Sequence, residues 1–332
     1  MRRLLPIVAT ALALVSCATV APPPPSAVAA VQGVLVAPDA VLLPGRFPAG
    51  DEPDGNSILL HGRDGLVVFD SGRHREHTQR ILDYAKASGQ PVVAIVNSHW
   101  HLDHVAGNAM LRAAWPQAHV HASRAIEGAM TGFLADERRQ LVEAIDRRQV
   151  PDAQVPALRE EIARIDAGSL LFPDRPAEAD GTLQLAGRTL QLGLSRDAVT
   201  AGDVWVFDPA RKLLLSGDLV TLPAPLFDTA CAPRWSAQLA RLDATPFATL
   251  VPGHGAPMDH AHFARYHLAF DHLLACAAGK EPSAACTEGW LRDAGDLVPS
   301  ADARLARGLL GYYLDQVLRA PADKRDRYCK AG

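Results

Sequence analysis

The segment Ser98-His99-Trp100-His101-Leu102-Asp103-His104 places three imidazoles and a carboxylate within six consecutive positions. It follows the apolar run Pro91-Val92-Val93-Ala94-Ile95-Val96, which predicts a buried strand with this segment on the loop at its C-terminal end. Imidazole and carboxylate are ligands that suit zinc, and a His-x-His pair followed by an Asp-His pair can face two adjacent metal positions. A helix would need His-x-x-x-His spacing, so the pattern predicts a metal site on a loop.

Further segments repeat the arrangement of a predicted strand that ends in polar residues. Residues 56–60 and 66–72 predict two strands joined by a turn, and the second ends in Asp70-Ser71-Gly72. Downstream, residues 213–218 predict a strand that ends in Asp218, and residues 250–255 bring in His254. Taken singly, Asp218 is as easily a strand-end cap and His254 a turn residue. Their order and their flanking strands favour ligand roles.

Together these segments resemble the metallo-β-lactamase superfamily over residues 31–260. The resemblance implies an α/β fold, a four-layer αββα sandwich whose two mixed sheets meet face to face, with metals at one edge. It also implies a zinc-dependent hydrolase, because zinc lowers the pKa of bound water and polarises an ester, lactone, amide or related bond. The implied metal ligands are His99, His101, Asp103, His104, Asp218 and His254.

One ligand of the family pattern is missing. The family usually supplies a further histidine before Asp218, in a stretch like His-Thr-x-Gly-Asp. Here Val199 stands at that position, before Thr200-Ala201-Gly202-Asp203, and residues 122–253 contain no histidine. Asp197 lies two residues earlier, on the same face of an extended segment, and is a candidate substitute ligand. A solvated acid in a loop is the alternative interpretation of Asp197.

The resemblance therefore implies two unequal metal positions. The first keeps only His99 and His101. The second keeps a complete set of three ligands: Asp103, His104 and His254. Because three protein ligands plus water suffice for a catalytic zinc, we expect one tight zinc and a weaker second one. Asp218 is able to touch either metal.

Two carboxylates are the candidate catalytic residues, Asp218 to position the water and Asp103 to accept its proton. Trp100 lies inside the signature, and Phe227 and Trp235 are expected on the loop after Asp218. These three aromatic residues are candidate substrate-binding residues, although each is equally compatible with a place in the core.

The N-terminus predicts export. Residues 1–16 combine Met1-Arg2-Arg3 with an apolar stretch too short to span a bilayer, which is typical of a signal peptide. Leu14-Val15-Ser16-Cys17 resembles a lipobox, so Cys17 is the predicted lipidation site and the protein a periplasm-facing outer-membrane lipoprotein. Residues 17–30 form an Ala/Pro-rich tether. The alternative is an ordinary signal peptide and a soluble periplasmic or secreted protein.

Four cysteines remain beyond Cys17, and an even number in an oxidising compartment favours disulfides. Sequence alone allows three pairings. We favour Cys276 with Cys286, which bracket a turn between helix-like segments, and therefore Cys231 with Cys329. Free thiols are the alternative.

Residues 31–332 are expected to form the catalytic domain, with two helical additions. Residues 124–176 carry apolar positions at helical spacing, broken near Pro151 and Pro156, and predict an inserted helical hairpin. This hairpin is either a lid or a surface embellishment. Residues 259–332 predict C-terminal helices.

Composition narrows the function. The 332 residues are 48% hydrophobic and 21% charged with a net charge of −4, which is typical of a soluble enzyme-sized domain and offers no basic channel for nucleic acid. We expect a small-molecule substrate and membrane contact only through the lipid anchor. Two alternatives stay open: a β-lactamase proper, and a non-catalytic metal-binding lipoprotein that has lost its first metal position.

Overall fold

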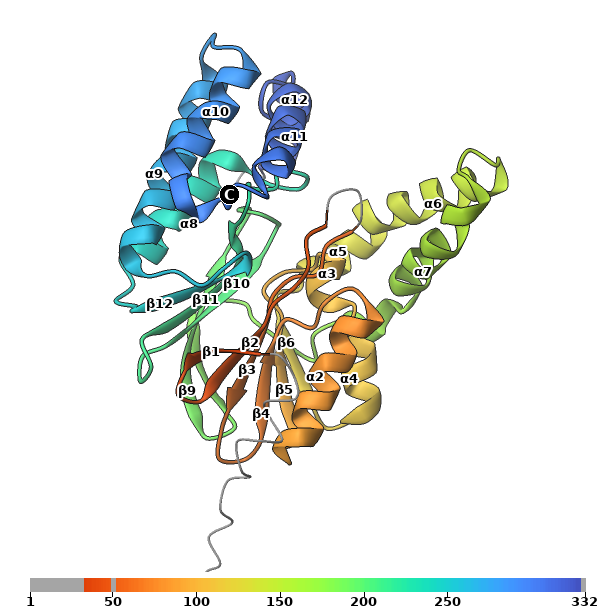
Figure 1. Ribbon diagram of the computed structural model, residues 1–332. Helices are drawn as coiled ribbons and strands as arrows, with labels where there is room; N and C mark the ends of the chain where they lie inside the picture. Colours follow the sequence, from red (N-terminus) through yellow and green to blue (C-terminus); the bar gives the residue numbers. More distant parts are fainter. Residues whose placement is uncertain (1–32, 49–51, 330–332) are drawn as a thin grey trace, which may run out of the picture.

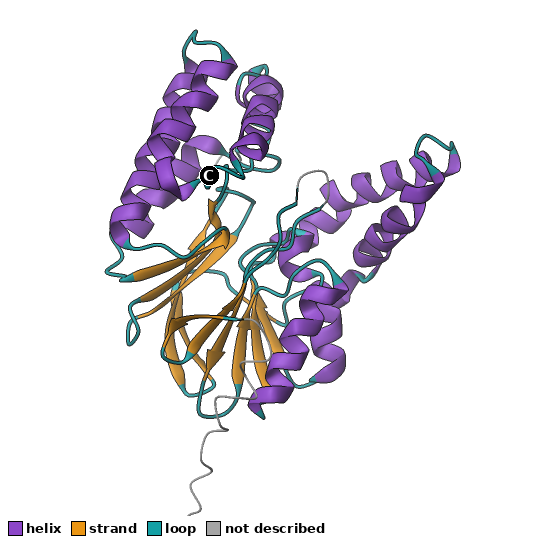
Figure 2. Cartoon of the chain, in the orientation of Figure 1, coloured by secondary structure: helices purple, strands orange, loops and turns teal. Residues whose placement is uncertain are grey.

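Two β-sheets face each other in the computed structural model, with helices on their outer sides (Figure 1, Figure 2). The structure describes residues 33–48 and 52–329. The expected four-layer αββα arrangement is confirmed. The predicted signal peptide, the tether and Cys17 lie outside the described residues.

The first sheet is mixed, antiparallel from β1 to β4 and parallel from β4 to β7. Its strands, in both chain and spatial order, are β1 (Val34–Ala37), β2 (Ala40–Leu43), β3 (Ser57–His61), β4 (Leu66–Phe69), β5 (Val92–Val96), β6 (His119–Ala122) and β7 (Arg175–Pro176). The second sheet pairs β11 and β12 in parallel and the others antiparallel. Its spatial order is β12 (Thr249–His254), β11 (Leu213–Thr221), β10 (Asp203–Asp208), β9 (Arg188–Ser195) and β8 (Gly181–Leu185).

Strand periodicity explains the layers. Successive side chains of a strand point to opposite faces, so β3 sends Ile58 and Leu60 into the core between the sheets and Leu59 toward the outer helices. On the first sheet the covering helices are α2 (Arg75–Ser88) and α4 (Asn108–Ala114). On the second sheet they are α8 (Ala232–Asp243) and α9 (His260–Ala278).

The two expected helical additions are visible as separate groups of helices (Figure 1). Residues 124–176 contain α5 (Ala125–Thr131), α6 (Phe133–Asp146) and α7 (Val155–Asp166), and α6 and α7 project together from the body of the fold. The C-terminal group continues after α9 with α10 (Ser283–Ala294), α11 (Ala303–Tyr313) and α12 (Ala322–Arg325). Within the described ranges, no helix is long and apolar enough to cross a bilayer.

Both favoured disulfides are present. Cys276 and Cys286 join α9 to α10, and Cys231, just before α8, joins Cys329 behind α12. The second bridge closes a loop of 98 residues and therefore ties the C-terminal tail to the segment that follows β11.

A buried histidine between α2 and β3 makes stability depend on pH. His77 is 3% exposed, its Nε2 lies 2.8 Å from Ser57 Oγ, and burial lowers its pKa to about 4 from 6.5. Because the unfolded chain takes up this proton first, the stability from His77 is fully present above pH 6.5 and is lost as the pH falls toward 4. The loss is roughly 3 kcal/mol.

We expect His77→Gln, which can still hydrogen-bond to Ser57, to reduce the fall in the free energy of unfolding between neutral and acid pH. Urea unfolding of the metal-free chain at pH 7 and pH 4.5 measures it. His119→Gln, which removes an exposed imidazole at a distant surface site, is the matched control. Equal acid destabilisation of the wild type and His77→Gln would contradict the assignment.

Candidate metal centre

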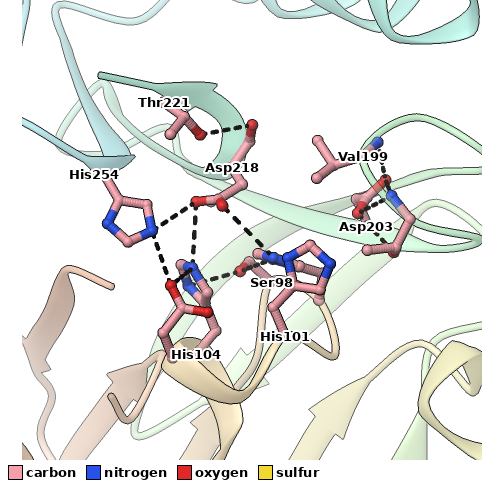
Figure 3. A network of polar contacts seen from close by, with 12 residues as sticks. Ser98, His101, His104, Val199, Asp203, Asp218, Thr221 and His254 are labelled. Carbon is pink, nitrogen blue, oxygen red and sulfur yellow. Dashed lines mark hydrogen bonds and ion pairs between the residues drawn. The ribbon is translucent and has the colours of Figure 1, made fainter. Parts of the chain in front are cut away.

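The segments singled out in the sequence meet at one edge of the two sheets (Figure 3). The loop that begins with His99 leaves the C-terminal end of β5 and continues into the short helix α3 (Leu102–Val105). Asp218 lies in β11 where its pairing with β12 shifts register, and His254 is the last residue of β12. Such irregularities re-aim a side chain out of the regular pleat. Both sheets therefore contribute to a single buried cluster.

Asp103, His104 and His254 form the first group of convergent ligand atoms. Asp103 Oδ2 lies 2.9 Å from His254 Nε2 and 3.3 Å from His104 Nε2. All three residues are at most 4% exposed. This is the set that the sequence assigned to the second metal position.

His99, His104 and Asp218 form a second group, which shares His104 with the first. Asp218 Oδ2 lies 3.7 Å from His99 Nε2, and Asp218 Oδ1 lies 3.2 Å from His104 Nε2 and 3.6 Å from His254 Nε2. The Asp218 carboxylate thus lies between the two groups, as a bridging ligand would.

The residues fit a divalent cation. Nε2 of His99, His104 and His254 and both carboxylate oxygens of Asp218 are buried and form no hydrogen bond in the described structure. Buried polar atoms are normally satisfied, so five converging unsatisfied atoms of metal-ligand type are consistent with a divalent-metal site.

Neighbouring side chains turn these nitrogens toward the cluster. Asp70 Oδ2 lies 2.8 Å from His104 Nδ1, and Ser98 Oγ lies 2.9 Å from His99 Nδ1. A carboxylate on the far nitrogen fixes the tautomer and leaves Nε2 for the metal. Asp70 also accepts hydrogen bonds from Ser98 N–H and Oγ, both 2.7 Å long, so it anchors the signature loop itself.

Two glycines let the backbone pass close to the ligands. A Cβ at Gly55 would lie 2.5 Å from His104 Cε1, and a Cβ at Gly253 would lie 2.0 Å from Asp218 Oδ1. Any larger residue at either position would displace a ligand side chain.

The charges at the cluster also favour a cation. Burial alone would lower the pKa of His104, but the carboxylates of Asp103, Asp218 and Asp70 raise it well above its usual value. A positive charge is therefore strongly favoured among these acids. Burial lowers the pKa of His99 well below its usual value, which keeps it the neutral imidazole that a metal binds.

His101 stands apart from both groups. Its Nε2 lies 2.9 Å from Thr229 Oγ1, and the Thr229 hydroxyl donates its hydrogen to the backbone oxygen of Val199, also at 2.9 Å. His101 Nε2 must therefore donate to Thr229, which leaves Nδ1 with the lone pair. The backbone carbonyl of Val199, which stands where the family pattern has a histidine, thus orients His101 through the Thr229 hydroxyl.

Thr229→Val is expected to weaken metal binding at the position of His99 and His101 about 10- to 100-fold, because side chains that hydrogen-bond to ligating histidines contribute that much to affinity. The tight site, which does not include His101, should keep its affinity. Competition with a chromophoric chelator measures both. Thr229→Ser retains the hydroxyl and serves as the matched control. Loss of the tight site alone would contradict this role.

Val199 and Asp197, the two residues considered at the missing ligand position, each have contacts of their own in the structure. Val199 is 1% exposed, and its N–H donates to Asp203 Oδ2 at 3.0 Å, an acid that also accepts from Thr200 (Figure 3). Asp197 pairs with Arg234 and belongs to neither ligand group. The structure thus corrects the suggestion of Asp197 as a substitute ligand, because its carboxylate is engaged elsewhere.

Two of the three aromatic residues suggested for substrate binding are corrected as well. Phe227 and Trp235 are 1% and 0% exposed within the core under the second sheet's helices. Trp235 belongs to α8, where its Nε1 donates to Leu219 O at 3.0 Å. Trp100 does line the cavity beside Asp103 and Asp218.

That cavity measures about 350 Å³, and its lining includes residues that sequence reasoning missed. They come from four separate parts of the chain: Arg73 before α2, Glu137 on α6, Asp228 after β11 and Tyr313 on α11. Each is an ordinary surface-type residue in its own segment, and only the tertiary fold brings them together. No sequence signal marks them.

A family model described as the metallo-beta-lactamase superfamily matches residues 50–254, more than half of the chain. Among curated proteins, an (R)-specific secondary-alkylsulfatase from a Pseudomonas species is 26% identical over 182 residues, 49% of this chain and 27% of that protein. A hydroxyacylglutathione hydrolase from a Synechococcus strain is 37% identical over 76 residues, 23% of this chain and 30% of that protein. The matched segments thus span less than a third of either relative.

Solved structures share the fold. A metallo-beta-lactamase from Pontibacter korlensis superposes with a TM-score of 0.51 at 21% identity, covering 71% of this chain and 96% of that one. A double mutant of a sec-alkyl sulfatase gives a TM-score of 0.59 at 18% identity, covering 87% of this chain and 51% of that one. At such identities the likeness concerns the fold alone.

Proposed function

The chain belongs to the metallo-beta-lactamase superfamily, and from that premise we propose that it is a zinc-dependent hydrolase of an ester, lactone, amide or related bond. One observation supports this most strongly. The buried ligand atoms of the centre converge beside a cavity, and most of these atoms form no hydrogen bond in the described structure. We propose one tight zinc, held by Asp103, His104 and His254 with Asp218 alongside.

Each residue then has a distinct task. Zinc, when bound, supplies the Lewis acid that activates water and polarises the scissile bond. Asp218 orients the attacking water from its place between the two groups of ligand atoms. Asp103 borders the cavity, with Oδ1 lying 3.9 Å from Arg73, and accepts the proton. Asp70 holds His104 in one tautomer while these charges change.

Chelation tests the proposal. The mature chain, stripped with EDTA and then restored with zinc, is assayed on esters, lactones, thioesters, β-lactams and alkyl sulfates. We expect hydrolysis of at least one class, lost on stripping and recovered with zinc. Equal rates with and without metal would exclude a metal-dependent hydrolase, and metal binding without turnover of any substrate would favour the non-catalytic alternative.

Alkyl sulfate hydrolysis is a second candidate. The curated relatives include two alkylsulfatases, one of them 26% identical over 49% of this chain, which supports this candidate. A β-lactamase proper is a weaker candidate, because Val199 removes a ligand from the first metal position. The same panel separates these outcomes.

We also propose that the protein is exported and anchored through Cys17 to the outer membrane, facing the periplasm. The lipobox-like sequence supports this, and so do two disulfides, which persist in oxidising compartments. Detergent partitioning should place the wild type in the detergent phase and Cys17→Ala in the aqueous phase. If the wild type and Cys17→Ala are both found in the aqueous phase with mature N-termini near residue 30, the segment is an ordinary signal peptide.

A further inference from the structure

The cavity beside the metal centre carries carboxylates on three further sides. Glu52 comes from the loop before β3, Glu137 from α6 and Asp228 from the loop after β11. Asp103 and Asp218 also border the cavity, but their charge is balanced once the centre holds a divalent cation. Of the other three acids, Glu52 pairs with Arg73, so Glu137 and Asp228 chiefly determine what charge a substrate meets.

Arg73 is the only lysine or arginine that borders this cavity in the described part of the chain, and its charge is already matched. Its guanidinium pairs with Glu161, and its Nη2 lies 3.4 Å from Glu52 and 3.9 Å from Asp103. Its side chain is only 10% exposed. An anionic substrate group would have to displace these acids to reach it.

Glu137 is the acid best placed to receive a cation. It is half-buried on α6, and its carboxylate forms no hydrogen bond or ion pair with any described residue. Burial, helped by the negative charges of Glu161, Glu52 and Asp228 and opposed by Arg73, raises its pKa to about 7. A cation at this point would relieve both the repulsion and the lost hydration.

Aromatic rings complete the surroundings. Trp100 and Phe133 lie with their ring centroids 5.5 Å apart, and Tyr313 donates its hydroxyl to Asp228 Oδ2 at 2.5 Å. All three border the cavity. Aromatic faces attract organic cations, and carboxylates beside them strengthen the attraction.

We propose that this cavity selects substrates that carry an organic ammonium group joined to the hydrolysable bond by a short chain, and disfavours substrates that carry an anionic group there. Glu137 is the principal contact, and Asp228 with the aromatic rings forms the rest of the subsite. The proposal rests on the hydrolase function and gives it a substrate class. It also separates this chain from the alkylsulfatases it resembles, whose name specifies an anionic ester.

Three matched 4-nitrophenyl esters test the preference: the 6-aminohexanoate, the heptanoate and the hydrogen pimelate. Their methylene chains are equally long and end in an ammonium, a methyl group and a carboxylate respectively. With the zinc-loaded full chain, kcat/KM should rise about tenfold from anionic to neutral and again from neutral to cationic, as one partly buried charge contact allows. The three corresponding hydroxamates, titrated calorimetrically, should bind in the same order and provide a readout without turnover.

Glu137→Gln should bring the cationic-to-neutral ratio close to one. Glu143→Gln removes the same charge from an exposed site on the same helix, paired with Arg147, and should keep the ratio. Equal binding and turnover of the three charge types, or a preference for the anionic one, would overturn the substrate class while leaving the hydrolase intact. Failure of every hydroxamate to bind and every ester to react would overturn the hydrolase proposal and this inference with it.

Discussion

Asp103→Ala is expected to lower hydrolysis roughly 1,000-fold, because it removes a metal ligand and the proton acceptor in one step. Its Oδ2 lies within 3.3 Å of both His104 Nε2 and His254 Nε2, so the remaining imidazoles lose the anion that draws a cation to them. Tight zinc should fall from about one to near zero per chain, measured by elemental analysis after dialysis.

Two comparisons make this result specific. Asp64→Ala removes a carboxylate that is 52% exposed and paired with Arg63, so metal content and rate should be unchanged. His254→Ala removes a different member of the same group and should repeat the metal loss. Full metal in both Asp103→Ala and His254→Ala would place the functional site elsewhere, with His99 and His101 as the next candidates.

Val199→His should raise tightly bound zinc from one toward two per chain. An isopropyl group cannot donate to a metal, whereas a third imidazole would complete the position of His99 and His101. Asp203 already holds the loop through Val199 N–H and Thr200, so the new side chain starts from an ordered backbone. We expect the affinity for zinc at the position of His99 and His101 to rise by roughly a hundredfold or more.

Val199→Ile is the matched control, because it changes the side chain without adding a donor and should leave one tight zinc. Asp197→Ala should also leave the stoichiometry unchanged, since that carboxylate pairs with Arg234. Two tight metals in the wild type, both surviving Asp197→Ala, would show that the chain completes the first position by another route.

The sequence was sufficient to predict the architecture and most of the side chains that the structure brings together at one edge of the sheets. His99, Asp103 and His104 follow a recognisable buried strand, and Asp218 and His254 end strands of the same kind. Such residues are predictable because local pattern and family resemblance point to the same edge of the sheets. The favoured disulfides followed from counting cysteines and recognising one turn.

The misplacement of Trp235 has a local cause. The expectation of a loop after Asp218 overlooks a helical pattern, with Pro233 near the helix start and apolar residues at Trp235, Leu239 and Leu242. That pattern places Trp235 on the buried face of a helix, as the structure shows.

Other features depend on contacts between distant segments and leave no mark in the sequence. The His101 tautomer is set by Thr229, 128 residues later. The substrate cavity joins Glu137 of the inserted helices to Tyr313 of the C-terminal helices. Interactions of this kind follow from how helices pack on the sandwich, which periodicity alone does not determine.

Anomalous diffraction at the zinc edge, on crystals of the wild-type chain equilibrated with zinc, tests the central claim most directly. The account predicts one strong peak in contact with Asp103, His104 and His254, and at most a weak second peak near His99 and His101. A strong peak at His99 and His101 with none beside His254, or no peak at saturating zinc, would contradict it.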